Sequence, residues 1–387
     1  MIGCVSIHTC EVDDKELALE QLTGQLSGKL TLKANTVGII MCHPEFIDSG
    51  VLSYVANGLP FPVVGTTTSS QSTNDVVSEM VLTIFVMTAD DVRFYVGRSE
   101  CVDSGIDEPL STALSKAPDS QPKLAIAFPP LLLKYPGDCY VESWVKAMPN
   151  VPVFGTLSVD DTLDFAGVKT ICGSEVYTSC ISFVLCYGNI NPRFLISTLP
   201  KESALPYRGE ITKATDHLVY EINDMPAVEY MRSMGFASDD NHMNVYWFVP
   251  FFISQRDRED FDGVPILRGF AEVDKDGTAI FRGKVDQGSQ FTMLNMSNEF
   301  VMDASAETIG RVAEMENVNG LLAFSCIVRR MTLMNTNSCE ELALAKNMLD
   351  DVPFMMGYAG GEICPTSIKD GVVTNRFHNF TMVVLVL

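Results

Sequence analysis

The sequence predicts an α/β to α+β fold in which layered, mixed β-sheets with flanking helices form two packed domains. The main observation is a block that recurs three times, each copy running from an apolar strand through a helical stretch and a Pro-to-Gly bend to a loop and a second apolar strand. Alternating strands and helices are typical of α/β layers, and adjacent final strands imply antiparallel pairing. A repeated β-α-β-β unit has its loops in equivalent places, so we expect the functional residues in the loops after the bends.

The three copies share one order of elements. Their first strands lie at residues 37–42, 123–128 and 320–326, their bends at residues 62–65, 152–155 and 353–357, and their closing strands at residues 80–87, 180–187 and 380–387. The third bend is one residue longer than the other two.

A further strand and helix precede the first copy. The strand lies at residues 4–7, and we expect the helix to begin at Asp13, where Asp13 and Glu16 fit a capping box. A spacing of four residues then places three apolar side chains on one helical face: Ala18, Leu22 and Leu26.

The second and third copies are preceded in the same way. We expect a strand at residues 93–96 before the second copy. Before the third copy we expect a strand at residues 290–294 and a helix over residues 305–315. The section between these copies, which contains an aromatic run at residues 245–253, is not a copy.

Length and composition indicate a globular protein outside the membrane. The 387 residues suffice for two domains, and a change of strand pattern near residues 216–223 places the boundary there. We therefore expect domains at residues 1–220, which include a leading strand and helix at residues 1–27, and at residues 221–387. No segment approaches the ~18 consecutive apolar residues that a membrane span needs.

Charge and cysteine content limit the partners and the compartment. A net charge of −22 disfavours binding to nucleic acid or to an anionic membrane surface. Eleven cysteines without a CxxC pair, several of them inside apolar strands, indicate buried thiols. Because residues 1–20 lack the pattern of a signal peptide, we expect a reducing cytoplasm.

Motifs of several enzyme classes are absent. The chain has no GxSxG, no GxGxxG and no GxxxxGK[ST], so a hydrolytic triad and a nucleotide-phosphate cradle are disfavoured. Cysteine and histidine show no regular zinc spacing, so we expect no metal site. The glycines near Gly360 and Gly361 can still bring backbone amides close to a small anion.

Polar residues after the apolar strands are candidate ligand contacts. Ser325, Cys326 and Arg329 follow the strand of the third copy, and Glu362 lies beyond its bend. Arg329 suits a carboxylate because its planar fork makes two parallel hydrogen bonds, and the carboxylate can belong either to a ligand or to a structural Arg–Glu pair. Hydroxyl groups after the first two bends suit polar ligands as well as turns: Thr66, Thr67 and Thr156.

These segments resemble the FIST family, named for F-box and intracellular signal transduction proteins. The resemblance covers nearly the whole chain and rests on Cys42-His43-Pro44-Glu45-Phe46, Pro62-Val63-Val64-Gly65-Thr66-Thr67, Val219-Tyr220-Glu221-Ile222-Asn223 with Pro226-Ala227, Phe324-Ser325-Cys326 with Arg329, Pro353-Phe354, Gly361-Glu362-Ile363, and His378-Asn379-Phe380-Thr381. It implies an N-terminal half at about residues 28–220 and a C-terminal half at residues 221–387.

The resemblance also implies a function. The family is regarded as a sensory module for small ligands, with amino acids suggested, and no catalytic activity is established for it. We therefore expect a non-enzymatic, stand-alone cytoplasmic sensor of an amino acid or carboxylate. Because no kinase, chemoreceptor, cyclase or F-box segment is attached to this sequence, we expect the output to pass through a separate signalling protein.

In this interpretation Arg329 engages the ligand's carboxylate and Glu362 its ammonium group. The full set of expected ligand contacts is Thr66, Thr67, Thr156, Ser325, Cys326, Arg329, Tyr358, Gly360, Gly361, Glu362, His378 and Asn379.

The sequence leaves two alternatives open. Some bacterial members of the family are similar to haem proteins that sense nitric oxide, which implies His43 or His378 as the axial ligand. The other alternative is a cysteine-dependent enzyme that uses Cys326 as a thiolate beside Arg329, although the sequence shows no base nearby.

Overall fold

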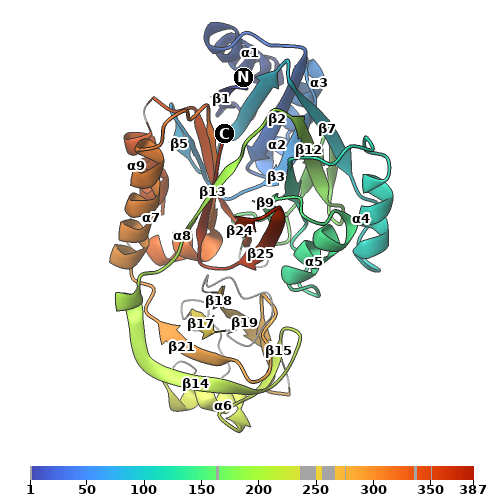
Figure 1. The fold of residues 1–387 in the computed structure, drawn as a ribbon. Coiled ribbons are helices and arrows are strands. Elements are labelled where there is room, and N and C mark those ends of the chain that lie inside the picture. Colours follow the sequence, from blue (N-terminus) through green and yellow to red (C-terminus); the bar gives the residue numbers. More distant parts are fainter. Residues whose placement is uncertain are drawn as a thin grey trace.

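Three copies of one strand-helix pattern form the body of the protein, and a separate sheet is inserted into the third copy (Figure 1). The structure is a computed structural model that describes residues 2–162, 165–235, 250–254, 266–274, 276–334, 338–349 and 351–387. Part of the predicted aromatic run, residues 245–249, lies outside these ranges. The predicted class of layered, mixed sheets with flanking helices is confirmed.

The first two repeats follow each other directly. The first contains β1 (Gly3–Thr9), α1 (Lys15–Lys29), β2 (Asn35–Cys42), α2 (Glu45–Asp48), α3 (Val51–Gly58), β3 (Val63–Thr67), β4 (Gln71–Thr73), β5 (Val77–Ser78) and β6 (Leu82–Ala89). The second contains β7 (Val92–Arg98), α4 (Asp107–Leu114), β8 (Leu124–Phe128), α5 (Asp138–Ala147), β9 (Val153–Thr156), β10 (Thr170–Cys172), β11 (Glu175–Tyr177) and β12 (Ser182–Gly188).

The third repeat is interrupted after its first strand. It contains β13 (Arg193–Ser197), then α7 (Asn298–Ala313), β22 (Leu321–Cys326), α8 (Ile327–Leu333), α9 (Glu340–Met348), β23 (Phe354–Ala359), β24 (Glu362–Lys369), β25 (Val372–His378) and β26 (Met382–Val386). The inserted sheet contains η1 (Lys201–Ser203), β14 (Ala204–Thr215), β15 (Leu218–Ile222), β16 (Met225–Pro226), α6 (Ala227–Ser233), β17 (Phe251–Ser254), β18 (Ile266–Arg268), β19 (Phe270–Val273), β20 (Ala279–Phe281) and β21 (Gln290–Leu294). The expected domain boundary between residues 220 and 221 falls within β15.

Each repeat builds a sheet in the same strand order. The orders are β1-β6-β2-β3, β7-β12-β8-β9 and β13-β26-β22-β23. In each sheet the last two strands are parallel and the other neighbours are antiparallel. The antiparallel pairing expected from adjacent final strands is therefore confirmed.

The repeats exchange their hairpins in a cycle. The hairpin β10–β11 of the second repeat extends the first sheet beside β3, β24–β25 of the third repeat extends the second sheet beside β9, and β4–β5 of the first repeat extends the third sheet beside β23. Each sheet therefore contains strands from two repeats.

The three sheets face a shared apolar core. Phe154 stacks on Phe324 at a ring-centroid distance of 5.1 Å, and Phe128 meets Phe324 edge to face at 6.0 Å. Three further apolar clusters lie on the opposite faces of the sheets, under the helices of the same repeats. Burial on both faces explains why these strands are continuous apolar runs rather than alternating ones.

The first helix follows its prediction closely. The structure places the N-cap at Asp14, one residue after the expected start, and the Asp14 side chain accepts a hydrogen bond from the Leu17 amide. The predicted face of Ala18, Leu22 and Leu26 is buried. None of the helices in the described part of the chain has the length and apolar character needed to cross a membrane.

The predicted opening of the third repeat is wrong. Residues 290–294 form β21, which pairs with β14 and β17 of the inserted sheet. The strand that takes the place of β1 and β7 is β13, which pairs with β26. The helix expected over residues 305–315 begins earlier, at Asn298, behind an N-cap at Ser297. Local pattern could not reveal this, because the insertion separates β13 from α7 by about a hundred residues.

The three predicted bends are instead short strands. In two of them, a close approach to the neighbouring strand explains why the position is a glycine. A Cβ atom at Gly65 would lie 1.7 Å from the Ile40 carbonyl oxygen, and one at Gly155 would lie 1.9 Å from that of Ala127. The third strand of each of these repeats therefore approaches the second too closely for any side chain at this position.

We predict that Gly65→Ala lowers the free energy of unfolding by at least about 2 kcal/mol, because the new methyl group overlaps a buried strand. The matched control is Gly24→Ala on the exposed face of α1, where nothing lies within 4 Å of the new atom. That change should raise stability by about 0.5–1 kcal/mol. Urea unfolding measures both, and equal effects of the two substitutions would contradict the close approach.

Candidate ligand-binding site

The loops after β3, β9 and β23 meet at the centre of the body. The Val159 amide donates to the Thr67 carbonyl at 3.3 Å, and the Gly360 amide donates to the Leu157 carbonyl at 3.0 Å. Each repeat therefore brings its loop to one place, as the recurring sequence block predicts.

The threonines of these loops hold the exchanged hairpins. The Thr66 hydroxyl donates to the Lys169 carbonyl, directly before β10, and the Thr156 hydroxyl donates to the Gly361 carbonyl, directly before β24. Thr67 also donates to the Lys169 carbonyl and accepts from the Lys169 amide. All three threonine side chains are fully buried. Their hydroxyls bind main-chain groups, so their expected contact with a ligand stays a prediction.

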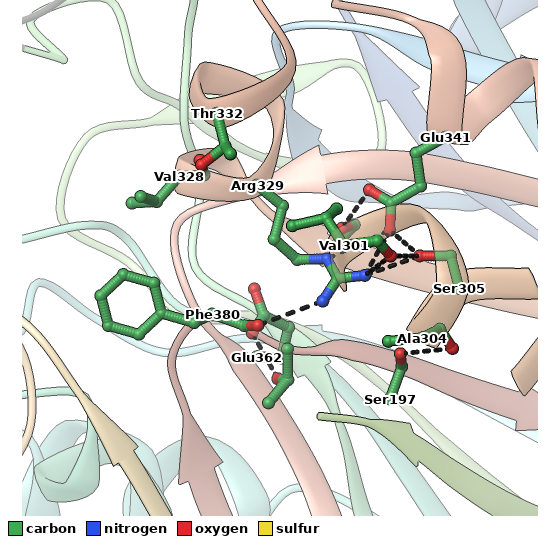
Figure 2. Close-up of polar contacts among 12 residues, drawn as sticks. Ser197, Val301, Ala304, Ser305, Val328, Arg329, Thr332, Glu341, Glu362 and Phe380 are labelled. Carbon is green, nitrogen blue, oxygen red and sulfur yellow. Dashed lines mark hydrogen bonds and ion pairs between the residues drawn. The ribbon is translucent and has the colours of Figure 1, made fainter. Parts of the chain in front are cut away.

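Arg329 forms a buried ion pair with Glu341 (Figure 2). The Nη2 atom of Arg329 lies 2.7 Å from Glu341 Oε1 and 2.6 Å from the Ser305 hydroxyl, and Nη1 donates to the Phe380 carbonyl at 3.2 Å. The Ser325 hydroxyl donates to the second Glu341 oxygen at 2.8 Å. These contacts join α7, α8, α9 and β22. The geometry favours the structural Arg–Glu pair, and a direct contact between Arg329 and a ligand stays a prediction.

Glu362 lies next to this cluster and is fully buried. Its Oε2 atom accepts a hydrogen bond from the Thr381 hydroxyl at 2.8 Å. Its Oε1 atom has no partner among the described residues. Burial raises the pKa of Glu362 well above its ordinary value, and the nearby Glu341 carboxylate acts in the same direction although Thr381 and Arg329 oppose it. Burial therefore favours the protonated form of this side chain.

A small cavity lies at the carboxyl ends of β22 and β23. Its volume is about 60 Å³, and it is lined by Leu131, Phe165, Gly269, Arg282, Cys326, Ile327, Val328, Gly360, Asn379 and Phe380. Three of the expected site residues, Cys326, Gly360 and Asn379, line it. Crevices at the carboxyl ends of parallel strands are common ligand sites in α/β proteins.

Two polar side chains among the described residues line this cavity, Arg282 and Asn379. The guanidinium of Arg282, at the end of β20, is half-buried, and no carboxylate among the described residues pairs with it. Burial lowers the pKa of Arg282, although the charge of Glu272 opposes the shift. The Oδ1 atom of Asn379 is also unpartnered within the described part of the chain, and the residue is only 6% exposed. The sequence analysis missed Arg282, because the inserted sheet is distant in sequence from these strand ends and meets them only in the folded protein.

Backbone strain marks the same cavity. Phe380 and Phe165 line it with φ values of 60° and 53°, a region that bulky residues rarely adopt. This conformation at Phe380 accompanies the contact of its carbonyl with Arg329. A Cβ atom at Gly269 would lie 2.3 Å from the Phe380 ring, so any side chain there would force this ring to shift. Strained residues of this kind gather at ligand sites.

The remaining expected contacts lie behind the cavity or away from it. Ser325 binds Glu341, Gly361 carries the carbonyl that Thr156 binds, and Tyr358 is buried on the helix-covered face of β23. The Tyr358 hydroxyl has no partner among the described residues.

The two histidines considered for haem do not fit an axial role. His43 Nδ1 accepts from the Glu45 amide at 3.2 Å, and its Nε2 lies 3.2 Å from Asp161. His378 is buried with Nε2 3.3 Å from the Cys364 carbonyl. Neither histidine is among the described residues that line the cavity. Its volume also falls well below the ~300–1,000 Å³ of pockets for larger ligands. Among the described residues, no group of three or more metal-ligating side chains converges.

Cys326 is poorly suited to act as a nucleophile. It is 3% exposed, and burial raises its pKa far above the ordinary value, with the nearby Glu362 adding to the shift. Nucleophilic cysteines instead have a lowered pKa and an exposed thiolate.

Comparison with protein families identifies the chain. The model described as FIST N domain matches residues 36–225, and the model described as FIST C domain matches residues 227–365. The chain belongs to the FIST family. FIST domains are sensory domains of signal transduction. The resemblance noted in the short sequence segments is thus confirmed.

Other comparisons of this FIST protein add little about function. No curated protein matches it. Among solved structures, a cyanuric acid hydrolase described as an evolutionary innovation by structural concatenation aligns with 10% identity and a TM-score of 0.29, covering 100% of this chain and 98% of the other. A similarity this low does not bear on activity.

We predict that Arg329→Met lowers the free energy of unfolding of this FIST protein by about 3–5 kcal/mol, because it leaves Glu341 buried without its partner. The control is Arg311→Met on the exposed face of α7, which should change stability by less than about 0.5 kcal/mol. Urea unfolding followed by circular dichroism checks both. A loss below about 1 kcal/mol for Arg329→Met would show that the pair is not a main structural contact.

A second prediction concerns pH and Glu362. Its pKa is raised in the folded state, so above its ordinary pKa of 4.5 the folded protein binds more protons at this group than the unfolded protein does. This group therefore lowers the free energy of unfolding as the pH rises above 4.5. Glu362→Gln removes this effect. The stability of the variant relative to the wild type should therefore increase between pH 5 and pH 8, by at most about 1.4 kcal/mol per pH unit. Urea unfolding across this range tests the sign, and a constant or shrinking difference would contradict it.

Proposed function

We propose that this FIST protein is a non-enzymatic cytoplasmic sensor that binds a small amino acid or carboxylate in the cavity at the ends of β22 and β23, and that signals through a separate protein. The observation that carries the proposal is Arg282, a half-buried residue of a mainly apolar cavity lining. No carboxylate among the described residues forms an ion pair with it, and only the charge of Glu272 acts on it from farther away. A buried charge without a partner is unfavourable, and an anionic ligand removes that penalty.

The size of the cavity sets the size of the ligand. A volume of about 60 Å³ holds roughly four to six water molecules at ~10–15 Å³ each, which corresponds to ~120–180 Å³ of liquid volume. A molecule of about six to nine non-hydrogen atoms fills such a space. The apolar side chains of Leu131, Phe165 and Val328 suit a branched aliphatic group.

The polar groups suit the two ends of an amino acid. Arg282 supports a carboxylate, for which its planar fork provides parallel hydrogen bonds. The unpartnered Oδ1 atom of Asn379 can accept a hydrogen bond from an ammonium group, in the role first expected of Glu362. Glu362 itself is not among the described residues that line the cavity, and burial raises its pKa, which makes it a weaker partner for an ammonium ion.

Three further observations support the remaining parts of the proposal. The raised pKa of Cys326 disfavours thiolate catalysis. Eleven free cysteines fit a reducing compartment. A net charge of −22 disfavours nucleic acid as the partner and leaves a protein as the recipient of the signal.

The test compares three probes by isothermal titration calorimetry: L-leucine, 3-methylbutanoate and 3-methylbutylamine. We expect the two carboxylates to bind and the amine, which lacks a carboxylate, to bind much more weakly. Arg282→Met should weaken carboxylate binding by about 10- to 100-fold, because a hydrogen-bonded charge contributes about 1.5–3 kcal/mol.

The matched control is Arg208→Met, which removes an exposed arginine from β14 of the same inserted sheet and should leave all affinities unchanged. Equal binding of the amine and the carboxylates would contradict the role of Arg282, as would carboxylate binding that survives Arg282→Met. If no probe binds, the proposal for this ligand class fails.

A further inference from the structure

The walls of the cavity come from two separate parts of the protein. Cys326, Gly360 and Asn379 belong to the third repeat of the body, whereas Gly269 and Arg282 belong to the inserted sheet. In Figure 1 the inserted sheet lies below the body, on the side of α5 and β25. A molecule that fills the cavity therefore contacts both parts at once.

Arg268, at the end of β18, joins the inserted sheet to the body. It is 1% exposed, and its Nη2 atom donates to Asp138 Oδ1 at the start of α5, at 2.9 Å. Its Nη1 atom donates to the Phe377 carbonyl of β25 at 3.1 Å. A guanidinium so deeply buried depends on these acceptors, since each lost partner leaves a donor unsatisfied.

Further bonds surround this arginine. The second oxygen of Asp138 accepts from the Lys284 amide at 2.8 Å, and the Gly137 amide donates to the Arg282 carbonyl at 3.2 Å. The Lys284 ammonium group lies 2.8 Å from Glu142 of α5. We call the set of Arg268, Asp138, Lys284 and Gly137 the docking contact.

The docking contact and the cavity share the same short segments of chain. Arg268 directly precedes Gly269, and Lys284 lies two residues after Arg282. On the side of the body, the Phe377 carbonyl that accepts from Arg268 lies two residues before Asn379. Movement of the inserted sheet away from α5 must therefore separate the two walls of the cavity.

We propose that ligand binding and docking of the inserted sheet are thermodynamically linked through the docking contact, with Arg268 and Asp138 as positioning residues. This inference rests on the proposed function. A ligand that touches both walls binds the docked state better than the undocked one, so it favours docking, and by reciprocity the docking contact increases the affinity for the ligand. The position of the inserted sheet would then carry the signal to the partner.

The test uses two measurements on the full chain with 3-methylbutanoate and L-leucine as parallel probes. The first is the affinity of Asp138→Asn, which keeps the shape of the side chain but removes the charge that Arg268 faces. We expect about a tenfold loss for each probe that binds the wild type, within the usual range of coupling between sites. The control is Asp107→Asn, which removes an exposed carboxylate paired with Lys146 and should leave the affinity unchanged.

The second measurement needs no variant and so does not depend on how well Asp138→Asn folds. Hydrogen exchange of the Gly137 and Lys284 amides, which donate across the interface, should slow at least about fivefold when the wild type is saturated with probe. The Leu17 amide at the start of α1 should exchange at the same rate with and without probe.

The outcomes separate the two proposals. Binding to the wild type with unchanged affinity in Asp138→Asn and unchanged exchange at Gly137 and Lys284 would overturn the linkage while leaving the ligand site intact. Failure of both probes to bind the wild type would overturn the proposed function and the linkage together.

Discussion

The open edge of each repeat's sheet is the constraint on which the rest of the structure depends. The strands β3, β9 and β23 would each leave one row of backbone groups unpaired inside the protein, which is strongly unfavourable. The hairpin of another repeat pairs with each edge, and Thr66 and Thr156 add their hydroxyls to these junctions. Because the loops that lead into the hairpins must cross at the centre, the strand ends and their polar residues gather there.

The buried cations of the protein differ in how they are balanced. Arg329 and Arg268 are almost completely enclosed, and each faces a carboxylate and backbone carbonyls. Arg282 is less deeply buried and has no such carboxylate among the described residues. The first two arginines hold helices and sheets in place, whereas among the described residues the third has only the more distant charge of Glu272 to act on it.

The sequence predicts the scaffold better than the site, for reasons visible in particular residues. Strands such as β2 and β8 are apolar on both faces, because one face packs against other sheets and the other against helices. Their recurrence is therefore recognisable in the sequence as repeated apolar runs. The gathering of Cys326, Gly360 and Asn379 follows from their positions after strands. The hydrogen bond from the Thr66 hydroxyl to the Lys169 carbonyl depends on a residue about a hundred positions away in the sequence. The place of Arg282 depends on Arg268 reaching Asp138, which no local pattern reveals.

The position of β26 between β13 and β22 has a consequence for biosynthesis. Its register places Arg193 opposite Val386, so the centre of the third sheet cannot form until residues 382–386 have been made. The hairpin β4–β5, synthesised early, must likewise wait for β23. Such long-range pairing makes folding slow and leaves unpaired strands on the nascent chain. The strands that pair last therefore stay exposed to association with other chains until translation is complete.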